Sequence, residues 1–218
     1  MPISGPERLV VAIDGPAASG KGTLARRLAA HLGRPHLDTG LLYRAVGRLM
    51  LDRGLELTDR ARAAAIADEI EPEHLDSARL RGSEVGEAAS VVSAYGPVRS
   101  ALVAFQRRFA NQPGGAVLDG RDIGTVICPG ATLKFYVTAS AEERARRRMR
   151  ELVAAGEAAT FEAVLADISR RDARDAGRET APMRPAPDAI LIDTTALDAD
   201  QAFARVLELM QPALAIPA

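Results

Sequence analysis

Residues 15–23 read Gly-Pro-Ala-Ala-Ser-Gly-Lys-Gly-Thr and decide the fold. They follow an apolar run of β-branched type, RLVVAID at 8–14, which is typical of a buried strand. They precede a stretch in which Leu24, Leu28 and Leu32 recur at helical spacing. Glycines in a turn between a strand and a helix let backbone N–H groups converge on phosphate oxygens, and the helix N-terminus adds its dipole. This arrangement predicts a P-loop, a phosphate-binding turn.

The residues of this loop have distinct expected roles. Lys21 is expected to reach the terminal phosphates, and the hydroxyl of Thr23 to serve a phosphate or Mg²⁺. Lysine occupies only two of the 28 lysine and arginine positions, Lys21 and Lys134, which fits a need for a compact ammonium at the first of them. We expect ATP to be the phosphate donor, bound by Gly15, Pro16, Ala17, Ala18, Ser19, Gly20, Lys21, Gly22 and Thr23.

Short apolar strands alternate with helices along the rest of the chain. This order is typical of an α/β protein in which helices cover both faces of a parallel sheet. We therefore predict a P-loop NTPase core with a doubly wound, parallel five-stranded sheet. Its strands are expected at 8–14, 36–38, 116–118, 133–137 and 189–192. Its helices are expected at 21–32, 41–51, 58–70, 84–93, 97–111, 140–155, 160–175 and 198–210.

Several of these helices begin with cap signals. Thr58 is expected to cap the helix that runs to residue 70, and Thr160 opens a later one. Ser140 with Glu143 has the spacing of a capping box. The polar stretch 71–82 is irregular, and its sequence assigns no element to it.

An acidic segment, Asp119-Gly-Arg-Asp122, follows the strand at 116–118. Residues at the carboxyl end of a sheet strand line the crevice in which such folds bind ligands. We expect Asp119 to orient Mg²⁺ through water, together with Thr23. The alternative is a structural turn stabilised by aspartate side chains, although Arg121 beside Asp122 is unusual for a turn alone.

Arginine is concentrated in two helical stretches of the C-terminal part of the chain. Acidic residues share these stretches with the arginines, so most of the arginines fit solvated helix faces with i,i+4 ion pairs. Phosphoryl transfer requires arginines that close over the phosphates, and we expect a lid at about 148–160 to use a few of them. The arginines concerned are Arg144, Arg146, Arg147, Arg148, Arg150, Arg170, Arg171, Arg174 and Arg178.

Composition narrows the class of protein. Of the 218 residues, 47% are hydrophobic and 26% are charged, as in a globular protein. A formal net charge of −1 and an aromatic content of 4% disfavour nucleic acid and anionic membranes as partners. The single cysteine, Cys128, excludes an intramolecular disulfide, and the few scattered histidines predict no zinc site. We expect a cytoplasmic monomer that binds neither nucleic acid nor a membrane.

Longer motifs connect these features to a known family. The Gly-Lys-Gly-Thr ending of the P-loop is similar to that of the adenylate and cytidylate kinase group. Asp-Thr-Gly followed by Tyr-Arg, and Asp-Gly-Arg-Asp-Ile-Gly-Thr, are more specific, and the chain resembles bacterial cytidylate kinases along nearly its whole length. The matching stretches are Ile13–Leu24, Leu37–Arg44, Ala88–Ala94 with Val98 and Arg99, Leu118–Thr125, Ser140–Met149 and Ile168–Pro182.

The resemblance implies a fold, an activity and a cofactor. It implies one kinase domain over 1–218, with a small acceptor-binding lobe at about 39–112 and the short lid at about 148–160. The implied reaction is transfer of the γ-phosphate of ATP to CMP, with dCMP as a second acceptor and Mg²⁺ as cofactor. Segment 70–83 departs from the family, because many members carry a longer insertion with a small sheet there.

The same resemblance implies roles for individual residues. Those implied to be catalytic are Lys21, Arg121, Arg148 and Arg178. The lid arginines are Arg144, implied to contact ATP, and Arg148. The implied CMP site includes Tyr43 and three groups of contacts. Thr39, Arg99 and Asp122 are implied to contact the cytosine edge, and Ser90, Arg171 and Asp175 the sugar. Arg44, Arg121 and Arg178 are implied to contact the acceptor phosphate.

Two other functions compete with this interpretation, besides a nucleotide-binding interaction module without turnover, which the array of acceptor-side arginines disfavours. One is a P-loop kinase for another small acceptor, such as UMP, a sugar or a shikimate-like metabolite. The other is a GTP-dependent switch, which requires an Asn-Lys-x-Asp motif that reads guanine. That motif is excluded here because Leu133 precedes Lys134 and the other lysine lies in the P-loop.

Overall fold

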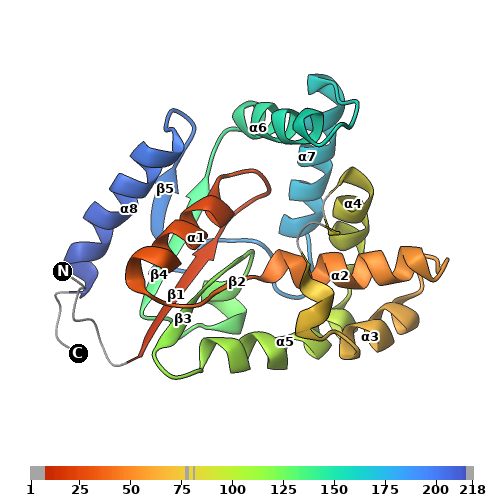
Figure 1. Ribbon diagram of the computed structural model, residues 1–218, viewed down its shortest axis with the longest axis horizontal. Helices are drawn as coiled ribbons and strands as arrows, with labels where there is room; N and C mark the ends of the chain where they lie inside the picture. The colour runs from red at the N-terminus through yellow and green to blue at the C-terminus, as the bar shows by residue number, and fades with distance from the viewer. Residues whose placement is uncertain (1–7, 77–78, 81, 215–218) are drawn as a thin grey trace.

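A parallel sheet forms the centre of the molecule. The computed structural model describes residues 8–76, 79–80 and 82–214. Five strands pair in parallel in the order β2-β3-β1-β4-β5 (Figure 1), which confirms the predicted sheet. The strands are β1 (Leu9–Asp14), β2 (His36–Asp38), β3 (Gly115–Gly120), β4 (Leu133–Thr138) and β5 (Ile190–Asp193).

The central strand explains both the winding of the chain and its own composition. β1 pairs with β3 on one side and β4 on the other, so the chain builds one half of the sheet before the other. Side chains alternate between the faces of a strand. Val11 and Ile13 therefore join the core under α1 and α8, while Val10 and Ala12 join the opposite core. Because both faces are buried, β1 is apolar from Leu9 to Ile13, as in other parallel sheets.

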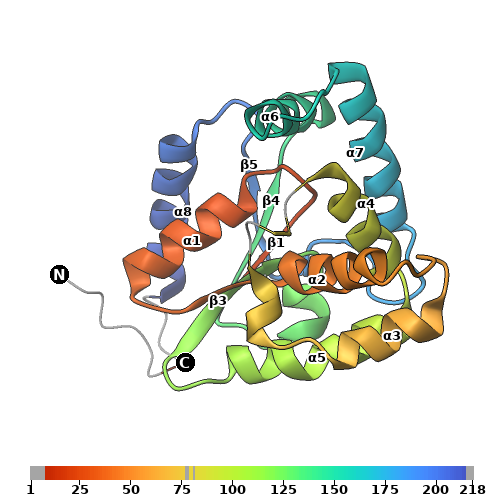
Figure 2. The same cartoon turned by 45° about the vertical axis from the view of Figure 1, so that its right-hand side comes forward.

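Helices cover both faces of this sheet. Figure 1 shows α1 and α8 side by side over one face, and Figure 2 shows α2 to α5 gathered on the other side. The helices are α1 (Lys21–Leu32), α2 (Thr39–Asp52), α3 (Arg60–Asp68), α4 (Ser83–Val92), α5 (Gly96–Ala110), α6 (Ala141–Ala154), α7 (Phe161–Ala176) and α8 (Ala199–Leu214), with short helical turns η1 (Pro72–Leu75) and η2 (Ile123–Ile127).

No single helix in the described ranges is long and apolar enough to cross a membrane. Within those ranges, α4 and α5 are the one pair of helices that passes that test of length and composition when taken together, and the two are bent by 99° at the break between them.

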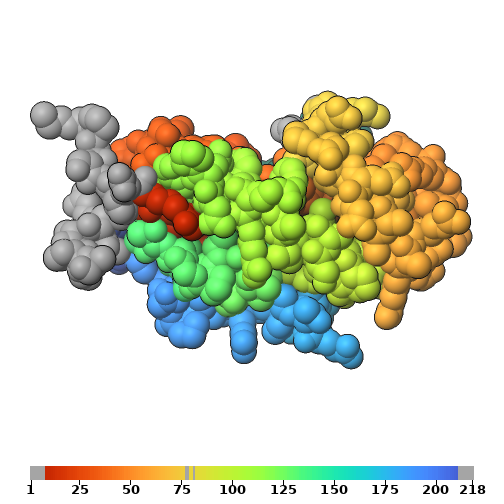
Figure 3. Space-filling model, turned by 90° about the horizontal axis from the view of Figure 1, so that it is seen from below, coloured from red at the N-terminus to blue at the C-terminus, as the bar shows by residue number. Residues whose placement is uncertain are grey.

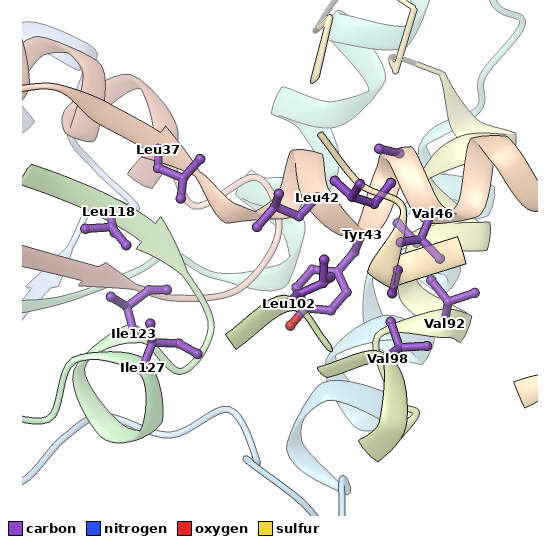
Figure 4. Close-up of a cluster of buried hydrophobic side chains, with 14 of the residues drawn as sticks. Leu37, Leu42, Tyr43, Val46, Val92, Val98, Leu102, Leu118, Ile123 and Ile127 are labelled. Atoms are coloured by element: carbon purple, nitrogen blue, oxygen red, sulfur yellow. The ribbon is translucent and has the colours of Figure 1, made fainter. Parts of the chain in front are cut away.

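The helices from α2 to α5 form one end of the molecule. Figure 3 shows their orange to yellow-green residues as that end, seen from below. Leu42 and Val46 of α2 pack against Val92 of α4 and Val98 and Leu102 of α5 in a single buried cluster (Figure 4). The cluster continues to β3 and η2, so the end that was predicted to be an acceptor lobe is packed directly onto the sheet.

Two predicted helix starts differ in detail. The cap of α3 is Asp59, whose carboxylate accepts the N–H of Arg62 at 3.0 Å, so the assignment of Thr58 was wrong by one residue. Ser140 does cap α6, because its Oγ accepts the N–H of Glu143 at 3.2 Å. The carboxylate of Glu143 instead pairs with Arg147 at 3.1 Å, so it serves an ion pair along the helix.

The segment between α3 and α4 is short. It contains η1, and no residue described between 70 and 83 forms a strand. This agrees with the absence of a strand pattern in the sequence, although residues 77, 78 and 81 of the segment lie outside the described part of the chain.

Candidate active site

The P-loop is shaped by residues that no larger side chain could replace. Gly15 leaves β1 with φ of 150°, and a Cβ there would lie 2.0 Å from the carbonyl oxygen of Val137. Gly20 takes a left-handed conformation at the start of α1, and no side chain caps that helix. The first N–H groups of α1 therefore remain available to an anion.

A pocket of about 330 Å³ opens in front of this loop. It gathers side chains from β2, α2, α4, α5, α6 and α7 and from the segment after β3. Most of the predicted site residues line it: Ala17, Ala18, Gly20, Lys21, Gly22, Thr23, Thr39, Tyr43, Arg44, Ser90, Arg99, Asp119, Arg121, Asp122, Arg148, Arg171, Asp175 and Arg178. The predicted residues that do not line it are Gly15, Pro16, Ser19 and Arg144.

Lys21 and two aspartates form the polar floor of this pocket. The ammonium of Lys21 lies 3.4 Å from the carbonyl oxygen of Pro16. Burial and the charge of Arg121 lower the pKa of Lys21 to about 8, while Asp119 and Asp38 oppose the change. A lysine held in this way is a proton-bearing cation at neutral pH, positioned at the mouth of a phosphate-binding loop.

Asp38 is a site residue that the sequence analysis missed. Its Oδ1 accepts the N–H of Gly40 at 2.9 Å and so caps α2. Burial and the charge of Asp119 raise its pKa. Asp38 lies beside Asp119 in the β2–β3 register, so two adjacent parallel strands carry an aspartate near their carboxyl ends, at the same edge of the sheet. That coincidence could have been found from the sequence, because 36–38 was expected to be a strand.

The residues around these aspartates fit Mg²⁺. Oδ1 of Asp119 lies 2.8 Å from Nε2 of His36. Oδ2 of Asp119 faces the start of α1, because a Cβ on Gly22 would lie 3.7 Å from it. Thr23 lines the same pocket. Mg²⁺ prefers oxygen ligands and takes one or two carboxylates together with water and substrate phosphates. Among the described residues no group of three or more acidic, histidine or cysteine side chains could hold a metal ion.

Two buried ion-pair groups occupy the far end of the pocket. Asp122 pairs with Arg99, and their side chains are only 6% and 5% exposed. Asp175 pairs with Nε of Arg121 at 2.9 Å and also with Arg178. Burial raises the pKa of Asp175, but the charges of Arg121 and Arg178 outweigh it and leave that pKa lowered. Arg121 is therefore held by Asp175 and not by its neighbour Asp122.

Several arginines lie close to one another in this pocket. Burial and the charges of Arg171 and Arg148 lower the pKa of Arg44 to about 10. Burial also lowers the pKa of Arg178, and its Nε and Nη1 are buried without a hydrogen-bond partner among the described residues. Donors left unpaired in this way are costly, so the pocket is arranged for an anion with several acceptor oxygens.

Arg144 lies behind the P-loop and not in the pocket. Its guanidinium donates to the carbonyl of Ala139 at 2.9 Å and of Ala17 at 3.4 Å, and pairs with Asp172 at 2.7 Å. The structure thus places Arg144 where it connects α6, α7 and the loop. Its neighbour Arg147, which the sequence analysis assigned to a solvated face, lines a different pocket.

This second pocket lies on the other side of the P-loop. Arg147 donates to the carbonyl oxygen of Thr194 at 2.7 Å and to its hydroxyl at 3.0 Å, and Thr194 in turn donates to the carbonyl of Ser19 at 2.9 Å. The cavity, about 570 Å³, is lined by the segment 194–199 after β5 together with α6 and α1. Two cavities of nucleotide size therefore meet at the loop.

Comparison with known proteins identifies the family. A family model described as cytidylate kinase matches residues 11–212. The cytidylate kinase of Xanthobacter autotrophicus is 61% identical over 203 residues, covering 93% of this chain and 97% of the relative. That of Methylobacterium sp. is 65% identical over 181 residues, covering 83% and 86%.

A solved structure agrees with the fold. An uncharacterised protein of Eubacterium ventriosum matches with a TM-score of 0.52 at 14% identity, covering 94% of this chain and 99% of that one. The family model spans nearly all of the sheet and the residues that line both pockets. The chain belongs to the cytidylate kinase family.

Proposed function

We propose that this chain transfers the γ-phosphate of ATP to CMP, giving ADP and CDP, and that it accepts dCMP as well. The observation that carries the proposal is the single pocket that joins the P-loop to a set of buried arginine–aspartate pairs. A donor phosphate at the loop and an acceptor phosphate at the arginines would meet within it. Family membership supplies the identity of the acceptor.

The donor nucleotide fits across the P-loop. Its phosphates would lie against the N-terminus of α1 and Lys21, whose ammonium follows the transferring group. The adenosine would occupy the second pocket, beside Arg147 and the 194–199 segment. Thr23 and Asp119 would hold Mg²⁺ at the junction, where the ion offsets charge on the phosphate oxygens.

The acceptor phosphate fits the three arginines that were expected to clamp it. Arg44, Arg121 and Arg178 come from α2, the segment after β3 and the segment after α7, yet all three line one pocket. Two donor nitrogens of Arg178, Nε and Nη1, have no hydrogen-bond partner in the part of the chain that the structure describes. This supports the role, because phosphate oxygens would pair with them.

The base fits between Asp122, Arg99 and Thr39. Asp122 can accept from the amino group of cytosine, and Arg99 can donate to its ring nitrogen or carbonyl oxygen. Ser90, Arg171 and Asp175 lie where the sugar would follow, and the hydroxyl of Ser90 accepts a hydrogen bond from Arg174 at 2.6 Å. Arg174 is thus an additional residue at the edge of the sugar site.

Catalysis in this site needs positioning and charge stabilisation only. The acceptor oxygen attacks the γ-phosphorus in line, the bond to the β–γ bridging oxygen breaks, and the arginines and Lys21 offset the charge that moves. Arg148 donates to the carbonyl oxygen of Gly82 at 3.3 Å, so the predicted lid touches the predicted lobe. Closure of the two would exclude water and limit ATP hydrolysis. We place this reaction in a cytoplasmic monomer.

The test is an assay that couples ADP release to a spectroscopic signal, run with CMP, dCMP, UMP, AMP and shikimate. We expect CMP to give the highest kcat/KM and dCMP to be used. A higher kcat/KM for any acceptor outside the CMP and dCMP pair would overturn the proposed substrate.

A further inference from the structure

Asp14 is a buried carboxylate that the mechanism above does not use. It ends β1 directly before the P-loop and is 3% exposed, but it does not line the phosphate pocket. Its Oδ1 accepts the N–H of Ile123 at 2.7 Å, and its Oδ2 accepts the N–H of Gly124 at 2.7 Å. Both oxygens are therefore directed at one backbone turn, η2, that follows β3.

This turn depends on Asp14 for its first hydrogen bonds. Helical turns leave their first N–H groups without a partner in the turn itself, and Asp122, which precedes η2, provides no side-chain cap. Asp14 takes that place from another strand. A Cβ on Gly124 would lie 3.3 Å from Asp14 Oδ2 and 3.2 Å from Cδ of Lys134, so glycine allows the close approach.

The residues just before the turn are those that meet the acceptor nucleotide in the proposed function. Asp122 pairs with Arg99 of α5, and Arg121 pairs with Asp175 of α7. Both pairs draw the segment toward the helices of the pocket wall. The two bonds from Asp14 attach the same segment to the centre of the sheet, so they fix its position from the opposite side.

We propose that Asp14 is a positioning residue for the acceptor site, whose ionised carboxylate holds the 121–124 segment in register for CMP and whose protonation weakens CMP binding without weakening ATP binding. The proposal rests on the proposed function for the identity of the acceptor. It adds a residue that touches neither substrate.

The surroundings of Asp14 place this change within reach of ordinary pH values. Burial raises its pKa to about 6, the charge of Asp122 adds to that, and the two backbone hydrogen bonds and Arg121 oppose it. On β4, Tyr136 lies opposite Asp14 in the strand register. Lys134 of the same strand lies opposite Ala12, and its side chain contacts Gly124. Cys128 follows the turn η2. Protonation of either carboxyl oxygen makes that oxygen a donor that faces another donor, the backbone N–H, and so removes the hydrogen bond between them.

The experiment compares wild type with Asp14→Asn, whose amide has the same shape but can accept only one of the two N–H groups. Calorimetric Kd values are measured for CMP and for ATP at pH 8 and pH 5.5. At pH 8 we expect the Kd for CMP to rise at least about tenfold, on the scale of one buried donor left unpaired, and that for ATP to change less than about twofold. At pH 5.5 the ratio of variant to wild-type Kd for CMP should fall toward one. The phosphate of CMP also titrates near this range, but it does so equally with both proteins and cancels in the ratio.

Two controls separate this role from a general effect on folding. Tyr136→Phe alters a neighbour of Asp14 without touching its two hydrogen bonds, and we expect an unchanged Kd for CMP. In ligand-free wild type, the amide NMR signals of Ile123 and Gly124 should titrate together with a midpoint near pH 6, a result that needs no variant to fold. The proposal is overturned if those two signals do not move between pH 5 and pH 7.5, if the variant weakens CMP and ATP equally, or if the Kd ratio for CMP is independent of pH. Failure of the wild type to bind CMP would instead contradict the proposed function.

Discussion

Replacement of Asp122 by Asn tests how the base is chosen. The carboxylate of Asp122 only accepts hydrogen bonds, and it is buried against Arg99, with exposed fractions of 6% and 5% for the two side chains. The cytosine amino group suits such an acceptor, whereas uracil presents a carbonyl oxygen there. We therefore expect wild type to prefer CMP over UMP by at least about tenfold in kcat/KM, because a buried unmatched polar pair costs about 1–3 kcal/mol.

The size of the effect in Asp122→Asn follows from the ion pair. Removing one partner of a buried pair costs about 3–5 kcal/mol, since the other charge stays buried. Asn keeps the volume and one acceptor oxygen, and Arg99 retains the ring of Tyr43 at 5.7 Å. We take about 2–3 kcal/mol as the loss for CMP, which is a fall of about 30- to 150-fold in kcat/KM. The amide can donate to the uracil oxygen, so UMP should lose less and the gap should narrow.

The assay measures kcat/KM for CMP and UMP in wild type, in Asp122→Asn and in a matched control, Asp175→Asn. The control breaks the other buried pair group, with Arg121 and Arg178. We expect it to lower kcat/KM for both acceptors by the same factor, because Asp175 is assigned to the sugar. If Asp122→Asn also leaves the ratio of CMP to UMP unchanged, Asp122 only holds Arg99 and does not read the base.

Three further outcomes are expected. Lys21→Arg should lower kcat at least about a hundredfold while the protein stays folded, because a planar fork replaces a compact donor that acts in the transition state; turnover near that of wild type removes Lys21 from its role. Single replacements of Arg44, Arg121 or Arg178 by Ala should raise the KM for CMP much more than that for ATP, and a larger rise for ATP would reverse the assignment of the clamp. The pKa of Lys21 is lowered to about 8, so its ammonium loses a proton as the pH rises through that value. In wild type, kcat/KM for ATP should therefore fall above pH 8. A pH profile of kcat/KM that stays level to pH 9.5 would contradict the requirement for a protonated Lys21.

Local patterns predicted the sheet and the P-loop well. Leu9 to Ile13 of β1 are buried on both faces of the sheet and therefore form an uninterrupted apolar run, and Gly15 to Thr23 have a fixed spacing between a strand and a helix. The sequence left a choice open at the start of α3. Thr58 and Asp59 are adjacent residues of the kind that cap helices, and only the path of the chain selects Asp59.

The arrangement of the ion pairs could not be predicted, because it depends on contacts between distant segments. Asp122 lies next to Arg121 in the sequence, yet its partner is Arg99, and Arg121 pairs with Asp175. From the sequence Arg147 resembles an ordinary surface arginine, but in the structure it lies on α6 and donates to the carbonyl oxygen of Thr194. The motif positions were therefore easier to predict than the partner that each of them takes.

The central claim is direct transfer between two nucleotides whose phosphates meet at the P-loop. It is tested by incubating the protein with CMP and ATP labelled in the γ-phosphate and separating the products after a short time. We predict that the label appears in the β-phosphate of CDP, one equivalent for each ADP released, with Lys21→Arg forming CDP at least about a hundredfold more slowly. Label released mainly as inorganic phosphate, or transferred as readily to UMP as to CMP, would contradict the account.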